Sequence, residues 1–125
     1  IRSFNSNSRV SLFIDSISND VINYEILDYC LKVGADTIEV HTGPFSKLIE
    51  AKHFNIIDSL RLLLERAKDK GLNINAGHDL NLLNLKYLKD LDLIDEVSIG
   101  HAIVVDALNF GFDDTIKKYI DIIKG

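Results

Sequence analysis

Short apolar runs alternate along the chain with longer segments in which apolar residues recur at helical spacing. The short runs are rich in β-branched and aromatic residues and are bounded by polar residues or glycine, which is typical of buried strands. We therefore predict strands at residues 10–14, 37–41, 72–76 and 96–99.

The longer segments predict helices, because each has an apolar face and most end at a glycine. Asn19 or Asp20 is expected to cap a first helix that continues to Val33 and ends at Gly34. Further helices are predicted at residues 56–67, at 80–91 as a short irregular helix, at 101–110 as a largely buried helix, and at 112–123. Residues 42–53 begin with Thr-Gly-Pro and are expected to be mostly loop with a little helix.

A strand followed by a helix, repeated four times, is the pattern of βαβ units in a parallel sheet, so we predict the α/β class. We expect a (β/α)8 TIM barrel, of which these 125 residues are about half, because a complete barrel has ~250. An open doubly wound sheet is the alternative. Its glycine-rich nucleotide turn is missing, since Asp15, Ser16 and Ile17 follow the first strand.

The composition argues against several classes of protein. A net charge of −5 provides no basic field for nucleic acid, and no run approaches the ~20 apolar residues of a membrane span. Residues 1–8 lack the apolar core of a signal peptide, so a cytoplasmic protein is expected. The single cysteine, Cys30, lies among apolar residues and is predicted to be a buried, inert thiol.

Candidate chemistry gathers at the carboxyl ends of the predicted strands, which form the working face of a barrel. His41, His78 and His101 lie at these ends, where a histidine can exchange protons near neutral pH, whereas His53 is expected to be solvated. For His78, a loop residue that only caps the next segment is the structural alternative. A zinc site built from the three strand-end histidines is conceivable, but no H-x-x-x-H or C-x-x-C spacing supports it.

Glu39 lies between Ile38 and Val40 in a predicted strand, where a carboxylate is unfavourable without a partner. One interpretation is a structural pair with a lysine or arginine. The other is a carboxylate that orients or stabilises charge beside a proton-transferring histidine.

A phosphate site is predicted where the last strand meets the next helix. Free amides at Gly100, His101 and Ala102 would point along the helix axis, where the helix dipole and unpaired N–H groups favour an anion. Glycine would leave room for the phosphate, although a tight strand-to-helix turn is the structural alternative. Gly77 offers a second close approach of backbone to ligand.

Four segments resemble those of pyridoxine 5′-phosphate synthases in order and spacing. They are residues 10–15 (VSLFID), 38–43 (IEVHTG), 75–78 (NAGH) and 98–103 (SIGHAI). The similarity runs from residue 10 to the end of the chain and corresponds to strands five to eight of that family's barrel. It implies that residues 1–125 are the C-terminal half of a single TIM-barrel domain and supply about its last four β/α units.

The resemblance implies an enzyme, a transferase-type condensation of 3-amino-2-oxopropyl phosphate with 1-deoxy-D-xylulose 5-phosphate. The products would be pyridoxine 5′-phosphate, inorganic phosphate and water, and no metal or organic cofactor would be used. His78 would match the proton donor and Glu39 the carboxylate that stabilises the transition state. Gly100 and His101 would bind substrate, as would Asp79, which stands where the family commonly has glycine. A carboxylate there would repel phosphate unless it faces away.

The implied partners are the two phosphorylated substrates, the N-terminal half of the barrel, and further copies in a homo-oligomer. An isolated half would expose sheet edges and apolar surface. One alternative function is an inactive half-barrel that binds phosphate or stabilises a complex. Another is a different sugar-phosphate barrel enzyme, such as an aldolase or isomerase. Those enzymes often use a Schiff-base lysine at a strand end, and the predicted strands contain no lysine.

Overall fold

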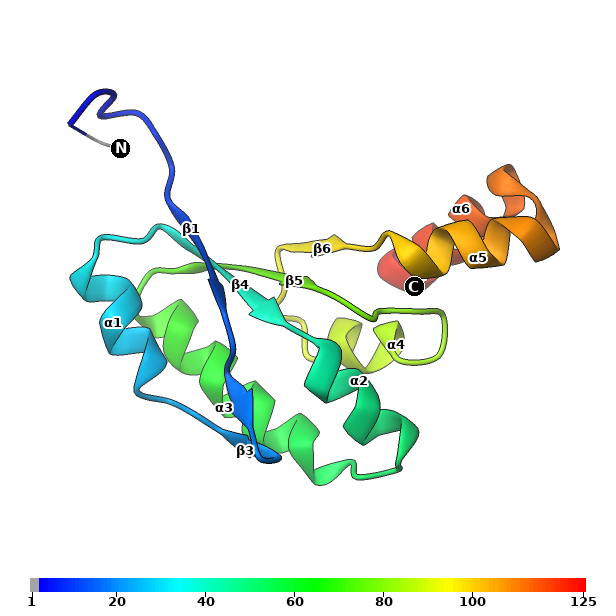
Figure 1. The fold of residues 1–125 in the computed structure, drawn as a ribbon, viewed down its shortest axis with the longest axis horizontal. Coiled ribbons are helices and arrows are strands. Elements are labelled where there is room, and N and C mark those ends of the chain that lie inside the picture. Colours follow the sequence, from blue (N-terminus) through cyan, green and yellow to red (C-terminus); the bar gives the residue numbers. More distant parts are fainter. Residues whose placement is uncertain (1–2) are drawn as a thin grey trace.

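The computed structural model describes residues 3–125 and contains a parallel sheet of four strands in the order β1-β4-β5-β6 (Figure 1). These strands are β1 (Ser11–Ile14), β4 (Thr37–His41), β5 (Asn73–Gly77) and β6 (Glu96–Ser98). All four predicted strands are confirmed to within a residue. The order of the four strands across the sheet is the same as their order along the chain, so each new strand pairs with the preceding strand of the sheet. The α/β class is therefore confirmed, and the order is consistent with a section of a barrel.

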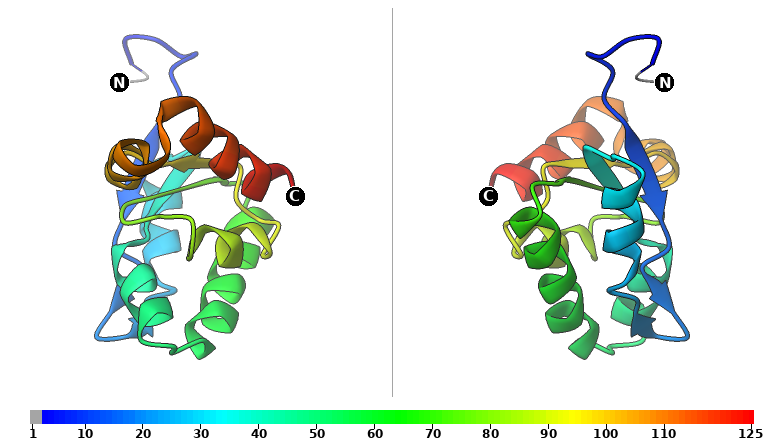
Figure 2. Two further views of the ribbon diagram at one scale, coloured as in Figure 1. Left: turned by 90° about the vertical axis from the view of Figure 1, so that its right-hand side faces the viewer. Right: turned by 90° about the vertical axis from the view of Figure 1, so that its left-hand side faces the viewer.

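Six helices connect and follow the strands of the described chain. They are α1 (Ile26–Lys32), α2 (Gly43–Glu50), α3 (Asn55–Asp69), α4 (Leu85–Lys89), α5 (His101–Phe110) and α6 (Phe112–Lys124). Figures 1 and 2 show α1 and α3 on one side of the sheet. In the part of the chain that is described, no helix has the length and apolarity needed to cross a membrane.

One hydrophobic core lies between the sheet and the helices. The predicted face of α3 is buried, and Gly71, at a φ of 82°, follows the helix as expected. The α3 residues in this core are Ile56, Leu60, Leu63, Leu64 and Ala67. Cys30 is buried as predicted, and its burial raises the pKa of the thiol. A thiol that stays protonated is a poor nucleophile, which supports the inert interpretation.

The two faces of the sheet differ in polarity. Ile38, Val40 and Ile74 are fully buried in the core, as expected for one set of alternating strand residues. On the opposite face the strand register places Phe13 beside Glu39 and Glu39 beside Asn75, and all three are partly or well exposed. Parallel sheets are usually covered on both faces, so this open polar face is unusual for the class.

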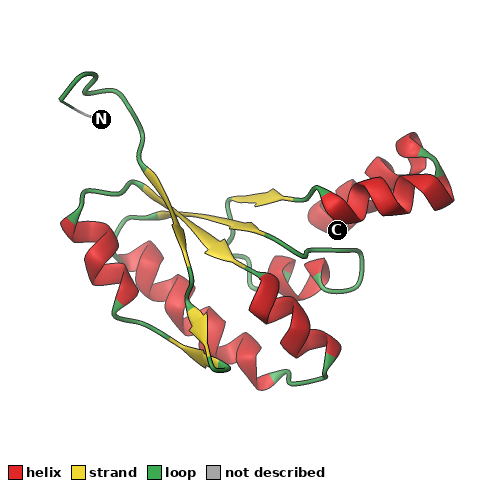
Figure 3. Cartoon of the chain, in the orientation of Figure 1, coloured by secondary structure: helices red, strands yellow, loops and turns green. Residues whose placement is uncertain are grey.

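The predicted start of the first helix was wrong. Asn19 and Asp20 do not cap a helix but form the two-residue loop of a hairpin between β2 (Ile17–Ser18) and β3 (Val21–Ile22), drawn as separate arrows in Figure 3. Their φ angles of 49° and 61° are left-handed, which Asn and Asp tolerate and a two-residue hairpin loop requires. The helix itself begins only at Ile26.

The expectation that residues 42–53 form mostly loop was also wrong, because residues 43–50 form α2. Pro44 lies in the first turn, where a backbone N–H has no acceptor within the helix. The proline therefore costs no helical hydrogen bond. Phe45, Leu48 and Ile49 are buried and hold α2 against the rest of the core. Tertiary burial therefore overrides the Thr-Gly-Pro signal for a loop.

The helix after Gly100 exists, but its predicted burial was wrong. No residue of α5 is fully buried, and Leu108 is 85% exposed. Figure 1 shows α5 and α6 projecting beyond the β6 edge of the sheet. The two helices are tied together by the Tyr119 hydroxyl, which donates a hydrogen bond to Asp106 over 2.8 Å. The apolar surface of α5 is thus left open.

Asp95 ties α3 to the sheet, and its replacement tests that link. Its carboxylate accepts hydrogen bonds from Lys68 Nζ at 2.5 Å and from the Ile74 N–H at 2.7 Å. Partial burial raises the pKa of Asp95, but these bonds and the Lys68 charge outweigh burial and lower it overall. Because the pKa of Asp95 is lower in the folded state, its carboxylate stabilises the fold at pH values above the ordinary aspartate pKa. This stabilisation is lost as the pH falls through the pKa of the folded state.

We expect Asp95→Asn to destabilise the protein by about 1 kcal/mol at neutral pH, as for one charge-assisted hydrogen bond. The difference from wild type should shrink as the pH falls below about 4. Urea unfolding of both proteins at neutral and acidic pH measures this. A difference that is equal at both pH values would contradict the assigned role of the carboxylate.

Candidate active site

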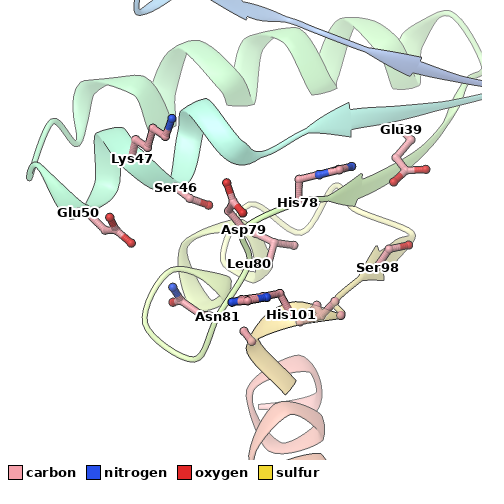
Figure 4. A pocket seen from close by; sticks show the side chains of 13 residues that line it. Glu39, Ser46, Lys47, Glu50, His78, Asp79, Leu80, Asn81, Ser98 and His101 are labelled. Atoms are coloured by element: carbon pink, nitrogen blue, oxygen red, sulfur yellow. The ribbon is translucent and has the colours of Figure 1, made fainter. Parts of the chain in front are cut away.

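A cavity of about 790 Å³ opens at the carboxyl ends of the strands (Figure 4). Its walls come from β4, α2, the segment after β5, the end of β6 and the start of α5. All five residues predicted to act in the site line this cavity, namely Glu39, His78, Asp79, Gly100 and His101. The fold therefore brings together groups that are far apart in the sequence.

Glu39 lies on the open polar face of the sheet, directly over Gly77 of the neighbouring strand. A Cβ built on Gly77 would lie 2.6 Å from Glu39 Oε1, so the carboxylate occupies space that a larger residue would fill. Within residues 3–125, no lysine or arginine forms an ion pair with Glu39. The carboxylate is thus held by its place on the sheet and not by a structural salt bridge.

His78 follows β5 in a left-handed backbone conformation, with a φ of 80°. Thr42 anchors this turn, because its hydroxyl lies 2.6 Å from the Gly77 carbonyl and 2.7 Å from the His78 carbonyl, and its N–H donates to Gly77 O. The next segment is capped by Asn81, whose side chain accepts from the N–H groups of Leu83 and Asn84. The histidine side chain is therefore not the cap of that segment.

Thr42→Val is expected to loosen the turn at His78. The hydroxyl is completely buried, and its loss would leave the His78 carbonyl without this donor, whereas Gly77 O would keep its bond from the Thr42 N–H. We expect a destabilisation of about 1–2 kcal/mol. Amide hydrogen exchange at residues 78–79 should become faster. Thr42→Ser keeps the hydroxyl and serves as the matched variant. Equal exchange rates in the valine and serine variants would show that the hydroxyl does not hold the turn.

Asp79 occupies a left-handed position as well, with a φ of 57°. Aspartate tolerates this conformation better than most residues, so it can stand where glycine would be the usual choice. Its Oδ2 lies 3.2 Å from the position of a Cβ on Gly43, at the start of α2, and Figure 4 shows the carboxylate turned toward α2 and away from His101. The Asp79 carboxylate would therefore not point at an anion bound near His101.

The start of α5 is open to the cavity. Gly100 precedes the helix with a φ of −119°, and no side chain caps the first turn. A Cβ on Gly100 would meet no atom within 4 Å, so neither backbone conformation nor packing requires glycine here. The space beside the first-turn amides suits a bound anion, because the helix dipole and the N–H groups both point into it.

The predicted meeting of histidines is found in part. The rings of His41 and His78 are in contact, with centroids 5.0 Å apart, and His101 lines the same cavity as His78 from α5. His53 is exposed, as predicted. Among residues 3–125, no group of three His, Cys, Asp or Glu side chains is placed to hold a metal ion.

The sequence analysis missed several residues around the site, among them the α2 residues Ser46, Lys47 and Glu50. Ser46 and Lys47 of α2 line the cavity, and the Ser46 hydroxyl is buried with no hydrogen-bond partner. They were missed because their segment was expected to be a loop. Asp15 hydrogen-bonds to His41, and the rule that selects residues at strand ends would have found it, since it directly follows β1.

Comparison with known families decides which proteins this chain resembles. Residues 2–125 match the family described as "Pyridoxal phosphate biosynthesis protein PdxJ". The chain belongs to the PdxJ family. This membership confirms the family resemblance that was inferred from the four sequence segments.

Three relatives of this PdxJ chain carry the name pyridoxine 5′-phosphate synthase. The protein from Cytophaga hutchinsonii is 39% identical over 93% of the chain and 47% of its own length. The one from Porphyromonas gingivalis is 40% identical over 90% of the chain and 45% of its own length. The one from Christiangramia forsetii is 35% identical over 99% of the chain and 51% of its own length. The chain thus spans about half the length of the curated relatives it matches.

Proposed function

We propose that this PdxJ chain forms part of the active site of a pyridoxine 5′-phosphate synthase. The observation that carries the proposal is the cavity, in which Glu39, His78, Asp79, Gly100 and His101 come together from separate strands and helices. The names of the relatives favour a reaction of vitamin B6 biosynthesis over other reactions of phosphorylated substrates.

The whole protein would condense 3-amino-2-oxopropyl phosphate with 1-deoxy-D-xylulose 5-phosphate to give pyridoxine 5′-phosphate, phosphate and water. An amine that adds to a ketone first forms a carbinolamine, whose hydroxyl must gain a proton before it leaves as water. His78, at the mouth of β5, would supply that proton. The iminium ion left behind is positive, and the Glu39 carboxylate would stabilise it across the cavity.

Substrate phosphate would bind at the start of α5. The uncapped first turn and the empty space at Gly100 support this placement, and the exposed His101 would add a donor from the same turn. Asp79 would contact substrate through its backbone, because its carboxylate is turned toward α2. Lys47 lines the same cavity and would contribute positive charge to it.

The remaining walls of the site would come from the rest of a (β/α)8 barrel. Four parallel strands in chain order, a polar sheet face left open, and coverage of about half of each relative all support this arrangement. An N-terminal half would pair with the exposed edges β1 and β6 and enclose the polar face. The exposed apolar residues of α5 would suit a homo-oligomer contact. A cytoplasmic location stays a prediction.

The proposal is tested by supplying purified full-length protein with both substrates. Formation of pyridoxine 5′-phosphate, followed by mass spectrometry together with phosphate release, is the expected result. A phosphate-binding protein without activity is the second candidate, favoured by the open start of α5. Binding of inorganic phosphate in calorimetry, with no product from the two substrates, would support that candidate and overturn the synthase.

A further inference from the structure

Asp15 and His41 form a pair beside His78 that the proposed chemistry does not use. The β1–β4 register places Asp15, the residue after β1, beside His41 at the end of β4. The β4–β5 register pairs His41 with Gly77, directly before His78. Three neighbouring strand ends therefore set these side chains in a row.

The bond within the pair fixes the His41 ring. Asp15 Oδ1 lies 2.5 Å from His41 Nδ1. An ionised carboxylate can only accept a hydrogen bond, so His41 Nδ1 carries the hydrogen. The second ring nitrogen takes no part in this bond. That second nitrogen, Nε2, lies 2.8 Å from where a Cβ on residue 43 would be. The His41 ring therefore has room because residue 43 is glycine.

The fixed His41 ring in turn packs against His78. The two rings meet edge to face, with an interplanar angle of 80° and centroids 5.0 Å apart. Phe13 contacts both rings at centroid distances of 5.2 Å. In the described part of the chain the His78 ring makes no hydrogen bond, so packing against these two rings is what orients it.

We propose that Asp15 and His41 are a positioning pair that sets the direction in which the His78 ring faces the cavity. The inference rests on the proposed role of His78 as a proton donor. Proton transfer requires the donor nitrogen to be within hydrogen-bond reach of the departing oxygen, so a rotated ring would transfer its proton poorly. A salt bridge that merely ties two strand ends would have no such effect on His78.

Two substitutions in the full-length protein separate these roles. Asp15→Asn removes the charge that fixes His41, and His41→Phe keeps a ring against His78 but removes the N–H to Asp15. Each is expected to lower kcat by about 10- to 100-fold, as for a misplaced proton donor, with KM changed less than about twofold. Asp28→Asn is the matched control, because Asp28 is a similarly exposed aspartate that pairs with Lys70 away from the cavity.

Nuclear magnetic resonance of the histidine rings provides a readout that is independent of turnover. In wild type, His41 should carry its hydrogen on Nδ1, and in Asp15→Asn this preference should be lost while the His78 ring signals shift. Unchanged His78 signals and wild-type kcat in both variants would overturn the inference. If His78→Asn stays active, the proposed function fails, and the ring signals alone decide whether the pair orients His78.

Discussion

His78→Asn in the full-length protein is expected to lower kcat by about 10²- to 10⁴-fold, the usual contribution of a positioned acid or base. Asparagine is close in size and polar, but it cannot deliver a proton to a leaving oxygen. The turn should survive, since Thr42 holds it through backbone carbonyls and asparagine tolerates the φ of 80°. Steady-state kinetics with both substrates, together with thermal melting, measure the two effects separately.

His53→Asn is the matched control for this substitution. His53 is exposed and lies outside the wall of the 790 Å³ cavity, so its replacement should leave kcat and the melting temperature unchanged. Turnover in His78→Asn that equals the turnover of this control would remove His78 from the proposed chemistry. A parallel loss of melting temperature and activity in His78→Asn would instead indicate a structural role.

Gly77→Ala is expected to lower kcat by about 10- to 100-fold with little change in stability. The new methyl group would lie 2.6 Å from Glu39 Oε1, so the carboxylate must leave its position. The displaced atom is the end of a flexible side chain, and the backbone at Gly77 is not left-handed. The fold should therefore adapt at a cost below about 1 kcal/mol.

A double-mutant cycle with Glu39→Gln tests whether this effect passes through the carboxylate. Glu39→Gln alone should also lower kcat strongly, since it removes the charge that would stabilise a cationic intermediate. Adding Gly77→Ala to Glu39→Gln should then have little further effect on kcat. Full additivity of the two losses would mean that Gly77 acts by another route.

Elements with a single dominant signal could be predicted from the sequence. The buried strands and α3 have apolar periodicity and glycine ends that agree with their tertiary packing. Asn19 and Asp20 carry an ambiguous signal, because the same side chains favour helix caps and hairpin loops. The choice depended on Val21 and Ile22 pairing with Ile17 and Ser18, which a local pattern does not show.

The site was predictable to the extent that parallel strands end at one edge of a sheet. That rule alone located Glu39, His78 and His101 near one another. It could not place Ser46 or Lys47, which depend on α2 forming. Nor could it give the direction of a side chain, so the turn of the Asp79 carboxylate toward α2 became visible only in three dimensions.

The division of β4 into two faces would separate the proposed chemistry from stability within a single strand. Ile38 and Val40 face the core, whereas Glu39 lines the cavity and His41 is bonded to Asp15. Substitutions at Glu39 and His41 would therefore alter the proposed reaction without opening a void beneath the sheet. Insertion or deletion of a single residue would exchange the two sets and drive a carboxylate into the apolar interior. Evolution can change the side chains of this strand far more easily than it can change its length.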